Sequence, residues 1–205
     1  MTIDIVYAPT EKSWIPNPDG ILLTEGPGAL RWIVPIPSAQ VEGTIRAGGK
    51  ETKVTGLGYH DVVATDIPPW RLPIRELLWG RALGGGWTVV FSQITKRQGA
   101  VLQNFHVSGH PGSGQSFVLQ AGEDDAAARI SLGNRTLTLK LKRIVEESRV
   151  TTEDRVRSRF LRAAMAGISG DPFEKKMLSD AFFGDGSSLR AGSAFHERVV
   201  WSWKK

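Results

Sequence analysis

Residues 136–142, with the sequence TLTLKLK, show the strictest alternation of apolar and polar side chains in the chain. Leu137, Leu139 and Leu141 fall on one side of an extended backbone, and the threonines and lysines fall on the other. Because side chains of a β-strand point alternately to its two faces, this pattern predicts a strand with one buried face.

Other runs of β-branched and aromatic residues occur on both sides of this stretch, and glycines separate several of them. The runs are 31–36, 41–47, 51–58, 79–82, 87–95, 101–107, 116–120 and 196–203. The glycines at 48–49 and 84–86 indicate hairpin turns, since glycine adopts the positive φ angles that tight turns require. Many short strands with glycine-rich turns favour a mainly β fold, an antiparallel barrel or sandwich.

The pattern becomes helical after residue 150. Thr152 is a plausible N-cap, and acidic residues follow it in the first turn. A second helix is predicted from Asp171, with Pro172 at its first position. That helix would bury Phe173, Met177, Leu178 and Phe182. We therefore expect a short helical insertion over about 152–184, before the last strand, within a single domain spanning 1–205.

The composition excludes several classes of function. The chain has 40% hydrophobic and 23% charged residues, which is ordinary for a globular protein, and it has no cysteine. No apolar run approaches the roughly 20 residues of a membrane span, and no secretory signal is recognised, so a cytoplasmic protein is expected. The net charge of +5 is spread along the chain, and no basic patch is interleaved with aromatic residues, so nucleic-acid binding is not expected.

A cluster of glycines and polar residues occupies 56–61 (GLGYHD). On a strand, Tyr59 and Asp61 share one face and His60 takes the other, although a bulge could bring His60 to Asp61. A carboxylic acid in an apolar cavity has a raised pKa and can protonate an alkene, and an aromatic face can stabilise the resulting cation. The alternative is a hydrogen-bonded cluster that fixes the rim of a barrel.

These segments resemble the carotenoid 1,2-hydratase (hydroxyneurosporene synthase) family of lipocalin-like proteins. The resemblance rests on residues 31–32, 35–37, 39–43, the Gly-x-Gly-Tyr-x-Asp segment at 56–61 and the Trp-x-Arg segment at 79–81. It implies a lipocalin-like antiparallel β-barrel, and it extends to related natural-product cyclases, including proteins that catalyse intramolecular Diels–Alder reactions without a cofactor. This chain has room for one such barrel. Residues 62–65 (VVAT) stand where relatives often carry polar residues, which favours cyclisation over hydration.

The resemblance and the cluster together predict a cofactor-independent cyclase that closes a ring in a hydrophobic polyene, polyketide or isoprenoid intermediate. The alternatives are a hydratase that adds water to an isoprenoid C=C bond and a non-catalytic protein that binds an apolar ligand. Asp61 is predicted as the acid or hydrogen-bond donor, with His60 as its orienting partner and Tyr59 beside it. The predicted substrate-binding residues are Trp32, Trp79, Arg81, Phe91 and Gln93.

No cofactor is expected, because the 56–61 cluster offers acid–base chemistry. No metal is expected either, because Pro111 prevents His106 and His110 from sharing a helix. The expected partner is a hydrophobic small molecule. Arginines at 155, 159 and 162 would share one helical face, which is typical of a solvated surface. Docking of an acidic carrier protein is the alternative for this face. Both a monomer and a homodimer remain open.

Overall fold

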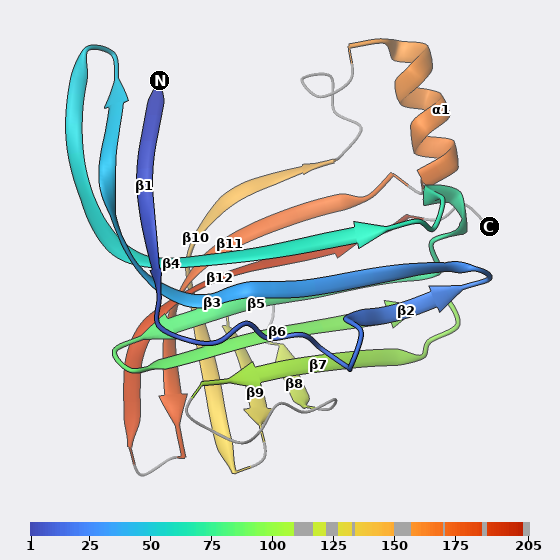
Figure 1. The fold of residues 1–205 in the computed structure, drawn as a ribbon. Helices are drawn as coiled ribbons and strands as arrows, with labels where there is room; N and C mark the ends of the chain where they lie inside the picture. The colour runs from blue at the N-terminus through green and yellow to red at the C-terminus, as the bar shows by residue number, and fades with distance from the viewer. Residues whose placement is uncertain are drawn as a thin grey trace. The chain divides into compact units, whose positions relative to one another are not determined.

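The computed structural model describes residues 1–108, 117–121, 127–132, 134–149, 157–169, 171–185 and 188–202. These ranges contain twelve β-strands, one α-helix and one short 3-10 helix (Figure 1). The mainly β prediction is therefore confirmed. The chain divides into two compact units, of which unit 1 comprises Met1–Leu22 and Leu30–Ala64, and unit 2 comprises Leu23–Ala29 and Thr65–Lys205.

Unit 1 is built on the long strand β3 (Gly28–Ala47). Strand β1 (Thr2–Pro9) pairs antiparallel with β3, from Thr2 opposite Arg46 to Pro9 opposite Ala39. Strand β4 (Lys50–Thr65) also pairs with β3, and β2 (Ile21–Glu25) completes the four-stranded sheet. The predicted turn between β3 and β4 is confirmed, with φ angles of 58° at Gly48 and 76° at Gly49.

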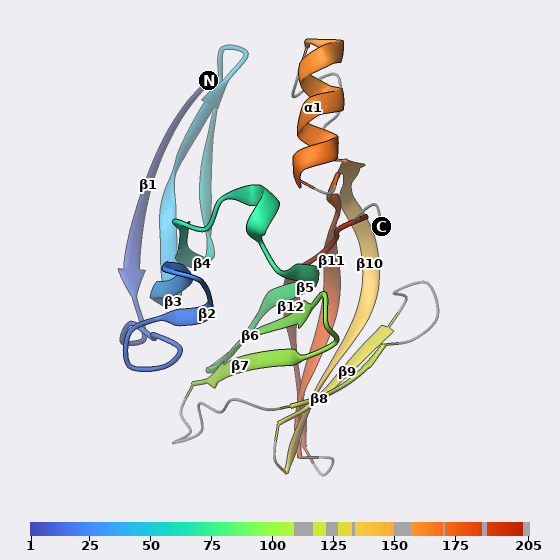
Figure 2. The same cartoon turned by 90° about the vertical axis from the view of Figure 1, so that its right-hand side faces the viewer.

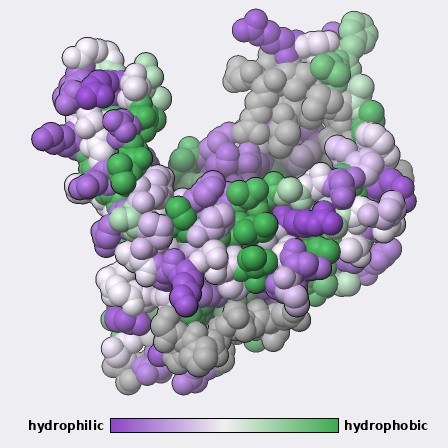
Figure 3. Space-filling view, in the orientation of Figure 1, coloured by the Kyte–Doolittle hydropathy of each residue, from purple (hydrophilic) through white to green (hydrophobic). Residues whose placement is uncertain are grey.

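Unit 1 buries several aromatic side chains and leaves other apolar side chains exposed. Trp14, Trp32 and Tyr59 are at most 8% exposed. Ile3 and Leu57 are 53% and 46% exposed, and Figure 3 shows apolar side chains along the part of β1, β3 and β4 at its upper left. The well-packed part of unit 1 is therefore the part that carries the Trp32 and Tyr59 side chains.

Unit 2 is an eight-stranded antiparallel sheet (Figures 1 and 2). Its strands are β5 (Ile74–Gly84), β6 (Trp87–Lys96), β7 (Val101–Val107), β8 (Val118–Ala121), β9 (Ala127–Leu132), β10 (Arg135–Arg149), β11 (Phe173–Gly184) and β12 (Leu189–Val200). The spatial order is β7-β6-β5-β12-β11-β10-β9-β8. The last strand, β12, pairs with the first strand of this sheet in the sequence, β5.

One face of this sheet forms a single hydrophobic core. The core contains Ala82, Trp87, Val89, Phe91, Phe105, Val107, Phe117, Ile130, Leu132, Leu137, Leu139, Ala181, Phe183 and Ala194. Edge strand β7 contributes Phe105 and Val107, and Leu119 of the other edge strand, β8, packs against this core. Phe117 meets Phe91 and Phe105 at ring-centroid distances of 6.3 and 6.5 Å. Opposite edges can share one core only if the sheet curls, so this sheet curls as barrel sheets do. The leucines of the opening stretch lie in this core.

The helical prediction is correct for one segment and wrong for the next. Helix α1 (Arg159–Ser169) lies in the predicted region, while residues 152–156 lie outside the described ranges. Residues 173–184, predicted as a second helix, form strand β11 and pair with β10 and β12 on both sides. Buried Met177, Ser179 and Ala181 follow a period of two, which strand pairing enforces over the helical spacing of the apolar residues. The helix therefore precedes the last two strands.

Candidate active site

The cluster at 56–61 lies on β4 of unit 1 and centres on the Asp61 carboxylate. The Trp32 indole N–H donates a hydrogen bond to Asp61 Oδ2 over 2.9 Å, and the Tyr59 hydroxyl lies 3.2 Å from the same oxygen. Trp14 packs edge-on against Trp32 with the ring centroids 5.3 Å apart. Both contacts converge on Oδ2, so Asp61 is held in place while its second oxygen has no hydrogen-bond partner among the described residues.

Tyr59 and Asp61 share a face of β4, as the sequence predicted, but His60 does not join them. His60 is exposed on the strand between two residues that point the other way. The structure therefore brings Trp32 and Tyr59, and not His60, to the Asp61 carboxylate, and the predicted role of His60 stays a prediction. Packing requires a glycine at position 58, because a Cβ there would lie 2.6 Å from the Tyr7 ring on β1.

We expect the Trp32 and Asp61 side chains to be energetically coupled. In a double-mutant cycle, Trp32→Phe and Asp61→Ala should show a coupling of about 1–2 kcal/mol in the free energy of unfolding, because the bond joins an indole donor to a carboxylate. Urea denaturation of the four proteins measures it. Asp4→Ala, an exposed change far along the same sheet, serves as the control and should be additive with Trp32→Phe. Additivity of the Trp32 and Asp61 changes would contradict the bond.

A row of side chains crosses unit 2 on the sheet face opposite the core. The row is defined by strand register, because each member lies opposite the next on the neighbouring strand. Its members are Ser92 on β6, Trp79 on β5, Glu197 on β12, Lys176 on β11 and Glu146 on β10. Glu174 lies two residues before Lys176 on the same face of β11, and we call these six residues the acidic row.

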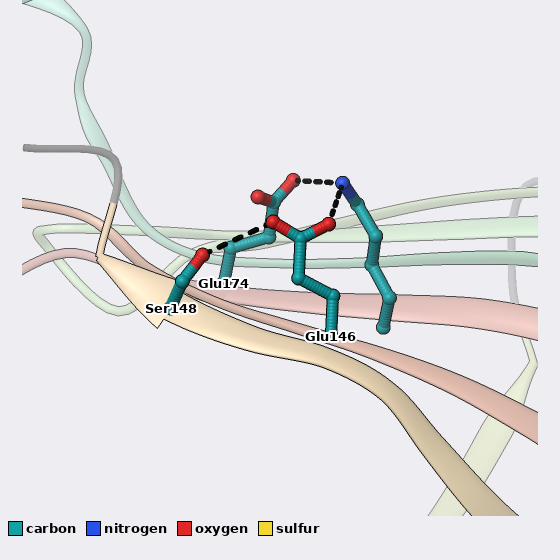
Figure 4. A network of polar contacts seen from close by, with 4 residues as sticks. Glu146, Ser148 and Glu174 are labelled. Atoms are coloured by element: carbon teal, nitrogen blue, oxygen red, sulfur yellow. Dashed lines mark hydrogen bonds and ion pairs between the residues drawn. The ribbon is translucent and has the colours of Figure 1, made fainter. Parts of the chain in front are cut away.

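The acidic row is joined by ion pairs and hydrogen bonds at its β10–β11 end (Figure 4). Lys176 Nζ lies 2.9 Å from Glu146 Oε2 and 3.3 Å from Glu174 Oε1. The Ser148 hydroxyl donates to the other oxygen of Glu146 over 3.2 Å. Two register shifts in β10, between Leu141 and Arg143 and between Ile144 and Glu146, bring Glu146 opposite Lys176.

Glu197 is the most buried carboxyl group of the row, with 8% of the residue exposed. Burial raises the pKa of Glu197 to about 8, and a hydrogen bond and negative charge from Glu174 add to the rise. The positive charge of Lys176 and a hydrogen bond with the Trp79 indole act in the opposite direction. Burial wins because the ionised form loses its hydration, so Glu197 is mostly protonated at neutral pH. A hydrogen bond with Glu146 raises the pKa of Lys176, which remains a cation.

The structure divides the predicted substrate-binding residues between two units and two sheet faces. Trp32 lies in unit 1, and the other four lie in unit 2. Trp79 and Arg81 share the face of the acidic row, where both contact Phe195: the Trp79 ring lies 6.2 Å from the Phe195 ring, and the Arg81 guanidinium 5.9 Å.

Phe91 and Gln93 lie on the opposite, core face of β6. Phe91 is completely buried in the core, and the Gln93 side-chain oxygen accepts a hydrogen bond from Gln103 over 2.7 Å. These two residues therefore do not share a sheet face with Trp79 and Arg81, and their assignment to substrate binding stays a prediction. Gly80 separates Trp79 from Arg81, and a Cβ there would lie 2.6 Å from Phe91 Cζ on the core side.

Sequence reasoning did not single out Glu197, Glu174 or Lys176. A signal was present, since Glu197 shares a strand face with Val199, and an acidic residue at an apolar position of a strand marks a candidate buried carboxyl group. Ser92 is the β6 member of the row, and its buried hydroxyl has no hydrogen-bond partner within the described ranges. The face therefore combines a protonated acid, an indole and an unused hydroxyl.

Comparisons with known proteins establish the fold but no family. No protein-family model matches the sequence, and no curated protein matches it either. Solved structures do match, and the chain spans about three fifths of their length.

Three of these structures illustrate the match. A candidate AttH protein from Nitrosomonas europaea aligns with 98% of this chain and 61% of its own, at a TM-score of 0.63 and 16% identity. Kievitone hydratase from Nectria haematococca aligns with 98% of this chain and 62% of its own, at a TM-score of 0.61 and 14% identity. CghA with Sch210972 aligns with 98% of this chain and 62% of its own, at a TM-score of 0.58 and 12% identity. The protein therefore has a mainly β, lipocalin-like fold, as the sequence predicted.

Three further observations concern the described residues. None of their helices combines the length and the apolar character that crossing a bilayer requires. No group of three or more His, Asp or Glu side chains there is arranged to hold a metal ion. Arg159 at the start of α1 is exposed, whereas residue 155 and the side chain of Arg162 lie outside the description, so docking of an acidic carrier stays a prediction.

Proposed function

We propose that this protein is a cofactor-independent enzyme that cyclises an apolar, unsaturated small molecule, with Glu197 as the proton donor or hydrogen-bond donor. One observation carries the proposal: the buried Glu197 carboxyl group, with a pKa of about 8, lies beside the Trp79 indole. A carboxylic acid that stays neutral near pH 7 can protonate a C=C bond or bond to a carbonyl oxygen. An indole face stabilises the cation that protonation creates.

The proposed cyclisation conserves its atoms. Glu197 transfers its proton to one carbon of a C=C bond, and the cation is captured by a second C=C bond of the same molecule. Loss of a proton from the cyclic cation returns Glu197 to its acid form, so the product is an isomer of the substrate. A cycloaddition in the same place needs only the hydrogen bond from Glu197 and the folded shape of the bound substrate.

Asp61 remains the second candidate acid. Its free oxygen can bond to a substrate while Trp32 and Tyr59 hold the other oxygen in place. Val63, which shares a face of β4 with Asp61, is 62% exposed, so apolar surface adjoins the carboxylate. This supports an apolar substrate and favours cyclisation over capture of the cation by water.

Hydration is the second candidate function, because one structure with the same fold is named a hydratase. The first step would be the same protonation by Glu197. Water would then add to the cation and give a proton back to the carboxylate. A non-catalytic role in binding an apolar ligand is the third candidate.

The test compares Glu197→Gln and Asp61→Asn with the parent on linear isoprenoids and synthetic polyene esters in ¹⁸O-labelled water. We expect Glu197→Gln to lower turnover by about 100-fold or more, as the loss of a general acid does. Glu76→Gln, a partly buried change on the other face of β5, is the matched control and should retain turnover. Product mass distinguishes the reactions, since an isomer indicates cyclisation and a gain of labelled water indicates hydration.

The remaining outcomes separate the other candidates. Asp61→Asn should abolish hydration if Asp61 is its acid, slow a shape-driven cycloaddition only in part, and leave simple binding nearly unchanged. Full turnover in Glu197→Gln contradicts the role of Glu197. Tight binding of these probes with no product from any of the proteins supports the binding protein.

A further inference from the structure

We propose that Glu174 and Glu197 share a single proton, and that Lys176, anchored by Glu146, keeps this proton on Glu197. The location of the proton follows from the geometry of the acidic row. Its consequence for catalysis rests on the proposed function of Glu197.

The two carboxyl groups are close together and poorly hydrated. Glu174 and Glu197 are in hydrogen-bond contact, and the Glu174 side chain is only 13% exposed. Two carboxylates in contact with so little water cannot both be ionised cheaply, because their mutual repulsion adds to the desolvation of each. One shared proton removes the repulsion and supplies the hydrogen bond between them.

Lys176 makes the pair unequal. Its ammonium group lies 3.3 Å from Glu174 Oε1 and contacts Glu146 on its other side. A cation in contact with Glu174 stabilises the ionised form of that carboxyl group. Glu197 instead faces Trp79 and is the more buried of the two, so the proton belongs on Glu197. Lys176 and Glu146 are positioning residues in this arrangement.

Other charged groups of unit 2 on this face leave the arrangement unchanged. Arg81 of β5 lies on the same face and packs against Phe195. Glu76 and Arg198 lie on the opposite face and pair with each other over 2.7 Å. The groups that face Glu197 from neighbouring strands are therefore Glu174 and Lys176 of β11, with Glu146 of β10 behind them.

Side-chain exposure rises from Glu174 at 13% through Lys176 at 26% to Glu146 at 39%, so Glu174 is the least solvated of these three side chains.

When Glu197 gives its proton to a substrate, the ionised Glu174 and Glu197 remain beside Lys176. Their repulsion favours recovery of a proton, either from the cyclic cation or from the water that adds to it. The row therefore resets the acid after each turnover.

Infrared titration of protein with ¹³C-labelled glutamate carboxyl groups tests the inference without any substrate. The parent should show one protonated carboxyl band near neutral pH, and Glu197→Gln should remove it. Glu174→Gln should lower the midpoint of the band, because a hydrogen bond and a negative charge are lost. Lys176→Met should raise the midpoint by about 1 pH unit, as loss of a neighbouring cation does. Lys175→Met, on the other face of β11, is the matched control and should leave the midpoint unchanged.

Each of the following results overturns the inference. They are an unchanged midpoint in Lys176→Met or Glu174→Gln, and two protonated bands or none in the parent at neutral pH. If Lys176→Met does not fold, Glu146→Gln replaces it. This change should lower the midpoint of the protonated carboxyl band, because Lys176 then pairs with Glu174 alone. Loss of turnover in Glu197→Gln with an unchanged midpoint in Lys176→Met would overturn the shared proton and leave the proposed function standing.

Discussion

The parent protein will lose stability relative to the Glu197→Gln variant as pH rises from about 4.5 to about 8. Burial raises the pKa of Glu197 to about 8 in the folded protein, from an ordinary value of 4.5. The folded state therefore binds this proton more tightly than the unfolded state does. The stabilising contribution is complete below about pH 4.5, declines as pH rises, and is lost above about pH 8.

The expected difference between the two proteins at pH 9, relative to pH 5, is roughly 2 kcal/mol in the free energy of unfolding. The pKa change from 4.5 to about 8 would by itself give a larger difference, and the lower figure allows for screening of the ionised carboxylate by solvent. Urea denaturation of both proteins at pH 5, 7 and 9 measures this difference. Contributions of the other titrating groups cancel, because the two proteins share them. Glu76→Gln is the control and should follow the parent. Parallel pH profiles for Glu197→Gln and the parent would show that Glu197 titrates normally.

Replacing Phe91 with alanine will cost about 3–5 kcal/mol of folding free energy, the largest effect expected of any single change discussed here. Phe91 is completely buried, packs against Phe117 and covers Gly80, which has no side chain to fill the space left behind. The surrounding strands are hydrogen-bonded on both sides and cannot close the cavity. Urea denaturation at neutral pH measures the loss.

Phe195→Ala is the matched comparison, because Phe195 is a partly buried aromatic residue on the face of the acidic row. Its truncation should cost less than about 2 kcal/mol and should weaken ligand binding, since Phe195 contacts Trp79 and Arg81. A Phe91→Ala protein that stayed fully stable and lost ligand binding would restore the sequence-based assignment of Phe91 to the substrate site.

The strands and hairpin turns followed from local pattern. Residues 136–142 alternate because one face of β10 lies in the core, and the glycines at 48–49 take positive φ angles. The segment 173–184 did not follow, because Asp171-Pro172 resembles a helix start and its apolar spacing fits both periods. Asp171 instead has a φ of 43° and its carboxylate pairs with Arg149, so it turns the chain into β11.

That one error explains most of what was missed in the candidate site. With 173–184 taken as a helix, Glu174 and Lys176 cannot be placed beside Glu197, and only the apolar face that Glu197 shares with Val199 marks it as a candidate buried acid. The pairing of Tyr59 with Asp61 was predictable because it depends on two residues of one strand. The raised pKa of Glu197 was not, because it depends on burial and on side chains that three strands bring together.

Gly80 has a mechanical consequence. At this position the wall between the core and the acidic row is one peptide backbone thick, with the Phe91 ring against it on one side and Trp79 and Arg81 flanking it on the other. Because the core and the acidic row share this backbone, repacking of the aromatic core will shift the strand that presents the Trp79 indole. The geometry of the acidic row will therefore be sensitive to substitutions in the core.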